Sequence, residues 1–285
     1  MKVALALDIP FLFFDFEKEY KEAVVDQMLV EYKAGRTPNP DVMCNREVKF
    51  GAFYRFAKEC GADAIATGHY RAGEKDQSYF LWAVPKDILQ ETLFPVGEME
   101  KSVVRALARK LDLPVANKRD SQGVCFLGSI SVEEFLKIEF GVRTGFARDE
   151  NGQTVGTHDG VLLYTLGERI ALHGAENGPW FVLKKDIKKN ELVVGKSRIP
   201  SRIDEQALIK FESTNWFGEP DMVTGAQYRY RGPLVPGHIQ GNAFVTTALL
   251  MEIPTPGQSI VFYDDGELIG GGIIASAMMP SEVVL

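Results

Sequence analysis

The pattern of apolar residues changes at Gly141, and this change limits the fold more than any other feature of the sequence. Before Gly141, apolar residues recur at helical spacing over residues 17–35, 101–111 and 132–140, between shorter apolar runs. After Gly141, short β-type runs are separated by Pro, Gly and Asp turns. The chain of 285 residues is therefore expected to be α/β followed by β, in two or three domains.

The first part predicts a parallel sheet with helices. Residues 10–16 and 63–68 read as buried strands, with two helices between them. In such a sheet, ligands bind beyond the carboxyl ends of the strands. The second strand stops at Gly68-His69, so both residues are candidates for a ligand-binding edge. A turn glycine and a partly buried loop histidine are equally good interpretations.

The second part predicts a small module and then an antiparallel barrel. Residues 164–167 and 180–183 look like strands of the module. Residues 264–266, DDG, are a hairpin signal, and the glycines at 270–272 read as a tight barrel corner rather than a phosphate loop. The expected barrel strands cover residues 207–211, 225–231, 243–249, 259–263 and 269–274.

Composition and cysteine usage indicate an ordinary soluble protein. Hydrophobic residues make up 45% of the chain and charged residues 25%, and no apolar run is long enough to cross a bilayer. Three cysteines are too few for a disulfide scaffold and suggest a reducing cytoplasm. No Cys or His cluster has zinc spacing, so no metal ligand is predicted.

The charge pattern argues weakly against a nucleic-acid partner. The net charge is −7, whereas phosphate binding needs a basic surface, which a local patch on an acidic protein can still supply. Arg229-Tyr230-Arg231 places two cations beside an aromatic ring, which suits phosphate and base contact. An exposed alternating strand explains this triplet equally well. The polar triplet KDQ at residues 75–77 has a simpler interpretation as a solvated helix start.

Cys44 lies in the most unusual local setting. Two prolines just before it remove backbone donors, so residues 37–41 are not expected to form a regular helix or a central strand. Asn45 is a candidate cap for a helix over residues 46–60. A thiol just before a helix N-terminus favours the reactive thiolate, and a buried, inert cysteine is the alternative. Cys125, in DSQGVCFLG, sits in a similarly odd stretch, which favours a role for both thiols.

A series of motifs resembles the bacterial tRNA-specific 2-thiouridylase family. The motifs occur in that family's order and span nearly the whole chain. Each is moderately specific by itself, and together they are highly specific. They are TPNPDVMCN (37–45), ATGHY (66–70), KDQSYFL (75–81), LFPVGE (93–98), KRDSQGVCFLG (118–128), YTLGER (164–169), RYR (229–231), TPGQ (255–258) and FYDDGELIGGG (262–272).

The resemblance implies a three-part architecture. Residues 1–142 would form a truncated Rossmann-like parallel-sheet domain of the PP-loop ATP pyrophosphatase type, which is adenine nucleotide alpha-hydrolase-like. Residues 143–203 would form a small central domain. Residues 204–285 would form a C-terminal antiparallel β-barrel that contacts tRNA.

The resemblance also implies a tRNA-uridine 2-sulfurtransferase that acts on C2 of the wobble uridine. In the family, ATP adenylates the uracil oxygen, and Mg²⁺ is expected with it. A persulfide on the second-motif cysteine, here Cys125, carries the sulfur. The first-motif cysteine, here Cys44, releases it, and the two can form a disulfide. Both thiols must therefore converge in space. The implied partners are tRNA and a cysteine desulfurase or sulfur-relay protein.

The remaining site residues follow from the same resemblance. Asn39, Pro40 and Asp41 would contact the target base, and Gly68 would contact ATP. Asp41 is also a candidate acid or base beside Cys44. The residues that would contact tRNA are His69, Lys75, Asp76, Gln77, Arg229, Tyr230 and Gln258.

The chain departs from the family pattern in several places. It contains no SGG-V-DS phosphate loop, and Met1 corresponds to the tail of the family's second helix. The connection from Tyr70 to Lys75 is short, and Glu168 replaces the usual glutamine. The 285-residue chain is therefore expected to bind ATP poorly and to thiolate tRNA slowly or not at all. A catalytically silent tRNA-binding remnant and a dithiol redox protein stay open as alternatives.

Overall fold

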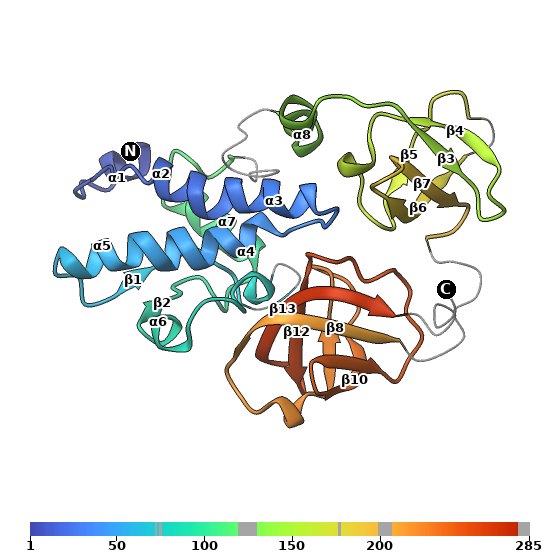
Figure 1. Ribbon diagram of the computed structural model, residues 1–285. Coiled ribbons are helices and arrows are strands. Elements are labelled where there is room, and N and C mark those ends of the chain that lie inside the picture. Colours follow the sequence, from blue (N-terminus) through green and yellow to red (C-terminus); the bar gives the residue numbers. More distant parts are fainter. Residues whose placement is uncertain (72, 74–75, 119–129, 176–177, 199–206, 279–285) are drawn as a thin grey trace. The chain divides into compact units, whose positions relative to one another are not determined.

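The computed structural model describes residues 1–71, 73, 76–118, 130–175, 178–198 and 207–278 (Figure 1). The chain forms two compact units. Unit 1 comprises Met1–Asp26 and Pro40–Phe126, and unit 2 comprises Gln27–Asn39 and Leu127–Leu285. The predicted class, α/β followed by β, is confirmed. In the described part, no helix combines the length and the apolar character needed to cross a bilayer.

Unit 1 is helical around a short parallel ladder. Strands β1 (Ile65–Ala66) and β2 (Thr92–Leu93) pair in parallel. Phe50, Ile65, Leu81 and Val84 form a buried cluster beside this ladder. Its helical segments are α1 (Lys2–Ala6), α2 (Glu17–Tyr20), the π-helical η1 (Lys21–Asp26), α4 (Pro40–Met43), the π-helical η2 (Cys44–Ala52), α5 (Phe53–Glu59), the 3-10 segment η4 (Ser78–Phe80), α6 (Lys86–Gln90) and α7 (Lys101–Lys110).

The strand predicted over residues 10–16 is wrong. These residues form no regular element, and Leu12 and Phe13 are 73% and 80% exposed. A strand is stable only when a neighbour accepts its hydrogen bonds and covers its faces. Within the described part of unit 1, the strand pairing joins β1 to β2 and leaves this segment outside. Apolar composition alone therefore misidentified it.

The helix predicted to start at Arg46 begins earlier, so Asn45 is not its cap. Segments α4, η2 and α5 follow one another without a break from Pro40 to Glu59. Proline is well suited to the first helical turn, because its fixed φ matches the helix and its missing N–H has no partner there anyway. Cys44 consequently lies inside the helix, one turn from its start, rather than in front of it.

Unit 2 contains a five-stranded sheet with the order β4-β3-β7-β6-β5. The strand predicted over residues 180–183 is confirmed within β6, whereas residues 164–167 form no strand. The helix predicted over residues 132–140 is confirmed, and a reciprocal capping box of Ser131 and Glu134 starts it. The elements are α3 (Gln27–Lys33), α8 (Val132–Phe140), β3 (Gly145–Arg148), β4 (Thr154–His158), η6 (Val161–Leu163), β5 (Arg169–Ile170), β6 (Trp180–Asp186) and β7 (Glu191–Gly195).

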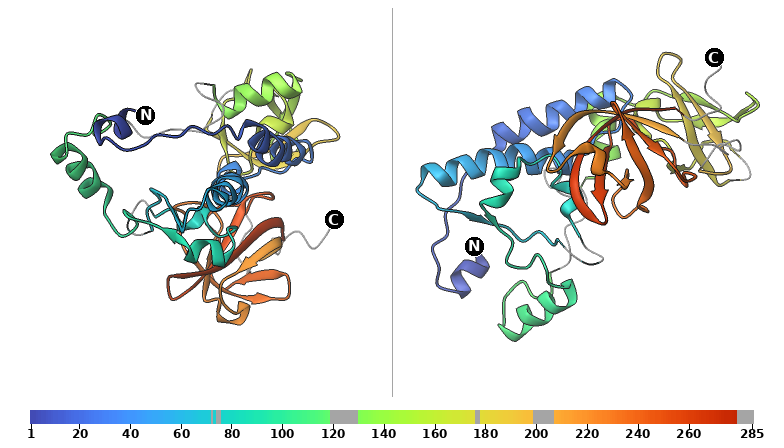
Figure 2. Two further views of the ribbon diagram at one scale, coloured as in Figure 1. Left: turned by 90° about the vertical axis from the view of Figure 1, so that its left-hand side faces the viewer. Right: turned by 90° about the horizontal axis from the view of Figure 1, so that it is seen from below.

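The second sheet of unit 2 closes into a barrel, with the order β10-β11-β8-β13-β12-β9 and antiparallel pairing throughout. Figure 2 shows it from two further sides. Asp265 and Gly266 have φ of 43° and 88° and make the predicted two-residue hairpin between β12 and β13. The barrel strands are β8 (Leu208–Trp216), β9 (Gly225–Gln227), β10 (Val235–Gln240), β11 (Ala243–Thr246), β12 (Ser259–Asp264) and β13 (Glu267–Met278), with a 3-10 turn η7 (Pro220–Met222).

Two expectations for the barrel have different outcomes. Gly270 packs closely, because a Cβ there would lie 2.5 Å from the Trp216 ring, so a packing role fits it better than a phosphate loop. The strand predicted over residues 225–231 is too long. It ends at Gln227, and residues 229–231 form a turn in which Arg231 has φ of 61°.

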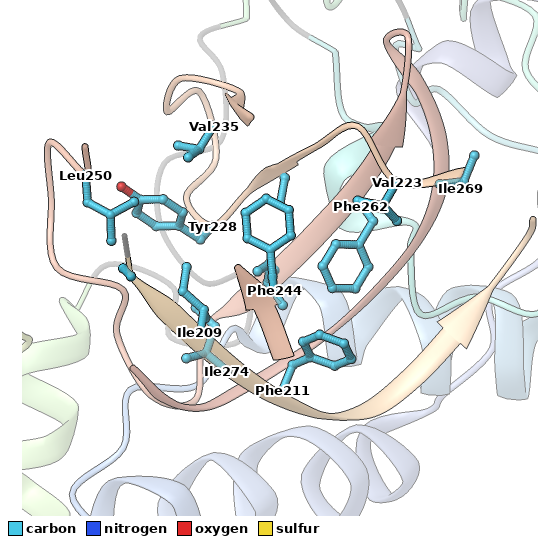
Figure 3. Close-up of a cluster of buried hydrophobic side chains, with 13 residues drawn as sticks. Ile209, Phe211, Val223, Tyr228, Val235, Phe244, Leu250, Phe262, Ile269 and Ile274 are labelled. Carbon is cyan, nitrogen blue, oxygen red and sulfur yellow. The ribbon is translucent and has the colours of Figure 1, made fainter. Parts of the chain in front are cut away.

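Aromatic rings pack against one another in the barrel core (Figure 3). Phe262 is fully buried, stacks on Trp216 at 5.0 Å between ring centroids, and meets Phe211 edge-on at 5.0 Å. Such contacts add to the hydrophobic stabilisation of the rings. The core residues are Ala207, Ile209, Phe211, Val223, Ala226, Tyr228, Val235, Phe244, Leu250, Ile260, Phe262, Ile269 and Ile274.

Phe262→Ala is expected to destabilise the barrel by about 3–5 kcal/mol, because it removes a buried ring and leaves a cavity. Native-state hydrogen exchange of the β8 and β13 amides reports the opening of the barrel itself. Leu249→Ala is the matched control, since Leu249 is 56% exposed and its truncation should cost less than about 0.5 kcal/mol. Equal effects of the two substitutions would contradict this account of the core.

Candidate functional site

The start of the long helix in unit 1 carries the first group of predicted site residues. Asp41 and Cys44 occupy neighbouring positions on consecutive turns. Cys44 is 5% exposed, which agrees with a buried cysteine, and Asp41 is accessible at the surface. Cys60, at the end of α5, is exposed. Cys125 lies outside the described residues.

Asn45 has a structural role that the sequence did not suggest. It is 2% exposed, and its Nδ2 donates a hydrogen bond of 3.0 Å to the carbonyl oxygen of Phe80. Its Oδ1 accepts a hydrogen bond of 3.0 Å from Lys49 Nζ. The side-chain amide thus ties the helix to the segment at Phe80 and holds the Lys49 ammonium in place.

Lys49 is a charged group that acts electrostatically on two predicted site residues of unit 1. Its charge acts both on the Asp41 carboxyl and on the His69 ring. Burial among protein atoms raises the pKa of Asp41, and Lys49 opposes this shift. With its pKa raised, the Asp41 carboxyl is a weaker acid than a fully solvated aspartic acid.

His69 follows β1 and is neutral at pH 7. Burial, with a further effect from Lys49, lowers its pKa to about 4. Its Nδ1 lies 3.0 Å from Thr67 Oγ1, and its ring lies 5.7 Å from that of Phe50. Without a bound partner, His69 therefore presents a neutral imidazole rather than a cation. Gly68 beside it is exposed, with open space where a Cβ would lie.

The polar triplet at residues 75–77 is only partly described, because Lys75 lies outside the described residues. Asp76 Oδ1 accepts a 2.8 Å hydrogen bond from the Ser78 amide. Gln77 and Tyr70 bond reciprocally: the Gln77 amide donates to the Tyr70 carbonyl at 2.8 Å, and the Tyr70 amide donates to Gln77 Oε1 at 3.1 Å. Gln77 therefore closes the loop that follows His69.

The other predicted site residues lie in unit 2. Asn39 directly follows Thr37 and Pro38, whose carbonyl oxygens accept hydrogen bonds from Gln258 Nε2. Arg229 forms an ion pair of 2.9 Å with Glu252. The turn that contains Arg229 also contains Tyr230, and the Arg231 guanidinium lies 5.1 Å from the centre of the Tyr230 ring.

Glu252 was missed by the sequence reasoning, and it holds a second cation. Arg198 Nη1 lies 3.1 Å from the same carboxylate, so one acidic residue pairs with two arginines that lie apart in the sequence. No local pattern points to this pairing. For Lys49, a signal did exist, because Asp41, Asn45 and Lys49 repeat at every fourth position of one helix.

A cleft of about 250 Å³ lies in unit 2 beside Thr37. Lys185 lines it, and burial lowers the pKa of Lys185 to about 8. Its Nζ donates a 2.7 Å hydrogen bond to the Tyr164 carbonyl, and the nearby Glu168 carboxylate favours its charged form. Glu168, which stands where the family usually has glutamine, accepts a 2.8 Å hydrogen bond from the Thr165 amide. The substituted side chain is thus accommodated beside a cation.

Metal ligands are not grouped in the described residues: no three His, Cys, Asp or Glu side chains there are placed to hold an ion.

The low pKa of His69 predicts a pH dependence of stability. The unfolded chain takes up a proton near pH 6.5, and the folded chain only near pH 4, so stability is expected to fall between these values by roughly 2–3 kcal/mol. His69→Gln should remove this part of the acid sensitivity, as measured by urea unfolding from pH 7 to pH 4. An imidazole NMR titration with a midpoint near 6.5 would disprove the burial argument.

Comparison with known proteins covers both units. Three family models match in succession: the tRNA methyl transferase HUP domain over residues 1–129, the tRNA methyl transferase PRC-barrel domain over residues 133–196, and the aminomethyltransferase beta-barrel domain over residues 206–274. These models agree with an α/β part, a central sheet and a closed barrel.

Full-length relatives agree with the family models. The tRNA-specific 2-thiouridylase MnmA of Listeria monocytogenes serotype 4a (strain HCC23) is 40% identical over 96% of this chain and 80% of its own length. The proteins of the same name from Streptococcus thermophilus (strain CNRZ 1066) and Streptococcus agalactiae serotype III (strain NEM316) are 39% and 38% identical, each over 99% of this chain and 83% of their own length. The chain therefore belongs to the tRNA-specific 2-thiouridylase family.

Proposed function

We propose that this chain is a tRNA-uridine 2-sulfurtransferase that forms 2-thiouridine at the wobble position. The observation that carries the proposal is its similarity, over almost all of its length, to proteins named tRNA-specific 2-thiouridylases. The position of Cys44 supports it, because this thiol lies one turn inside a helix that opens directly from the proline-containing loop. Asn39, Pro40 and Asp41 of this loop are proposed to contact the target uracil.

Sulfur transfer is proposed to use two thiols. Cys125, which lies outside the described residues, carries the sulfur as a persulfide. The Cys44 thiolate attacks Cys125 Sγ, a Cys44–Cys125 disulfide forms, and the persulfide S–S bond breaks. The outer sulfur leaves with the bonding electron pair and is thereby a nucleophile. Reduction of the disulfide by a thiol reductant would restore both cysteines.

Asp41 is proposed to take the proton from Cys44. The two side chains lie on consecutive turns, and the raised pKa of Asp41 brings this carboxyl closer to the range in which a base works near neutral pH. Lys49 sets the balance, because its ammonium favours the ionised carboxylate. Cys44 is only 5% exposed, so its proton acceptor is proposed to be a neighbouring side chain rather than solvent.

ATP, with Mg²⁺, would supply a leaving group on the uracil oxygen. Gly68 lies beyond the end of β1, with open space where a Cβ would be. This leaves room for the base of a nucleotide to approach the backbone. An SGG-V-DS stretch, which would cradle the phosphates, does not occur within residues 1–285. The residues that would hold the triphosphate are therefore left unassigned, and none of the steps proposed here passes through ATP.

Further contacts are proposed with tRNA and with a sulfur donor. The tRNA contacts are assigned to His69, Lys75, Asp76, Gln77, Arg229 and Tyr230, and the donor is a cysteine desulfurase or a relay protein. Cysteine thiols of this kind suit a reducing cytoplasm. We also propose domain boundaries at residues 1–142, 143–203 and 204–285.

Cys44→Ser is expected to stop sulfur release from the loaded chain. The chain is first persulfidated with a cysteine desulfurase and cysteine, and sulfide release is then followed without ATP. The variant should keep its persulfide and release sulfide at least about 100-fold more slowly, because its hydroxyl does not attack sulfur. Cys60→Ser, at an exposed cysteine, should release sulfide at the wild-type rate.

The outcomes of this experiment separate the alternatives. Equal release by Cys44→Ser and wild type would end the role assigned to Cys44. A gel shift with tRNA transcript tests the binding step independently. Rapid sulfide release without any tRNA shift would support a dithiol redox protein, and a tRNA shift without release in the wild type would support a silent tRNA-binding remnant.

Asp41→Asn is expected to slow sulfide release about 10- to 100-fold at pH 7, because the amide cannot accept the thiol proton. The deficit should shrink at pH 9, where solvent ionises a thiol of ordinary pKa without help. Asp63→Asn makes the same charge change at an exposed site of unit 1 and should leave the rate unchanged. A deficit that is constant from pH 7 to pH 9 would contradict a base role.

A further inference from the structure

Residues 37 and 38, which precede the proposed base-contacting residues, lack local hydrogen-bond donors for their backbone. Thr37 and Pro38 are buried, and the prolines at positions 38 and 40 have no N–H to donate. Buried carbonyl groups need hydrogen-bond donors, and in this segment the donors must come from elsewhere in the chain.

The donor is a turn of the barrel formed by the motif TPGQ at residues 255–258. The Gln258 amide donates to the Thr255 carbonyl at 3.1 Å, and Gly257 has φ of 91°, as in a type II turn with proline second and glycine third. Strand β13 anchors this turn from one side. The Gly257 amide donates to the Ile274 carbonyl, and the Ile274 amide donates to the Gln258 carbonyl, both at 2.8 Å.

The other side of the turn holds the segment. The Thr37 amide donates to the Pro256 carbonyl at 2.9 Å. The side chain of Gln258 returns two bonds, since Nε2 donates to the Thr37 carbonyl at 2.8 Å and to the Pro38 carbonyl at 3.1 Å. A primary amide has two N–H hydrogens, and both are used here.

The fit leaves no room at Gly257. A Cβ there would lie 2.9 Å from the Thr37 oxygen and 3.0 Å from Arg36 Cβ, and a side chain at φ of 91° would be strained as well. Two features of the turn are therefore matched to the segment: an amide that supplies both donors, and a residue without a side chain that permits the approach.

We infer that Gln258 is a positioning residue, which fixes the Thr37–Pro38 backbone and thereby the position of Asn39, the first of the proposed base-contacting residues. This inference rests on the proposed function only for the role of Asn39. For Gln258, this is a role separate from the expected tRNA contact, which stays a prediction. Both N–H donors are occupied and the remaining Oε1 is an acceptor, so a contact with phosphate is disfavoured and substitution should change tRNA affinity little.

The test uses three variants of the full chain and needs neither ATP nor tRNA. Gln258→Glu replaces the donor by a carboxylate that faces two carbonyl oxygens, and Gly257→Ala forces the turn away. Gln240→Glu makes the same charge change at an exposed position of the barrel. Hydrogen exchange of the Thr37 amide is followed by mass spectrometry, and far-UV circular dichroism checks the fold.

Exchange at Thr37 is expected to accelerate about 10- to 30-fold in Gln258→Glu and Gly257→Ala, as the loss of two modest hydrogen bonds predicts, and to stay unchanged in Gln240→Glu. Unchanged exchange in Gln258→Glu would overturn the inference. Binding of tRNA transcript is measured in parallel by fluorescence anisotropy, and a Kd within about twofold of wild type is expected. A tenfold weaker Kd with unchanged exchange would show that Gln258 is an RNA contact.

A final comparison separates this inference from the proposed function. Sulfide release from the persulfidated chain depends on Cys44, and Gln258→Glu should slow it less than Cys44→Ser does. Faster Thr37 exchange in a chain that never releases sulfide would retain the positioning role and reject the proposed sulfur transfer.

Discussion

The conformation of the proline-containing loop at residues 37–39 depends on hydrogen-bond donors from elsewhere in the chain. A segment with two prolines exposes carbonyl groups that have no local donors, so its shape must be set by another part of the chain. In this protein, a Pro-Gly turn of the barrel provides one acceptor and two side-chain donors for residues 37 and 38. The loop and the turn are more than 200 residues apart in the sequence and act as one structural element.

The electrostatics of unit 1 depend on one cation in a similar way. Lys49 is held by Asn45, which is itself held by the Phe80 carbonyl. Because this chain of contacts fixes the ammonium, its charge acts on an acid that burial has made weaker and on a histidine that burial has made neutral. The site therefore depends on a buried amide that takes no part in chemistry.

Features with a local cause were predictable. The helix over residues 132–140 and the Asp-Gly hairpin both follow from short-range chemistry, and both were found where the sequence predicted them. Features that need a distant partner were not predictable. Residues 10–16 look like a strand but pair with no strand in the described part of unit 1. The Gln258 amide bonds to carbonyl groups that no sequence pattern around it predicts.

The effect of proline on helix formation was predicted wrongly. Two prolines predict no helix up to position 41, but the first helical turn is the place where a helix tolerates proline best. The error moved Cys44 from inside the helix to a place in front of it, and with it the argument for a dipole-activated thiol. The proposed activation of this thiol therefore relies on a neighbouring side chain instead.

The carboxylate of Glu252 gives the two arginines a built-in anion. A phosphate that reaches Arg229 exchanges one negative partner for another, so the protein gives up an existing ion pair at each such contact. Binding of a phosphate at this site then releases fewer small ions into solution than the number of arginines implies. For the tRNA contact proposed at Arg229, the dependence of affinity on salt concentration should therefore be shallow for the charge of this surface.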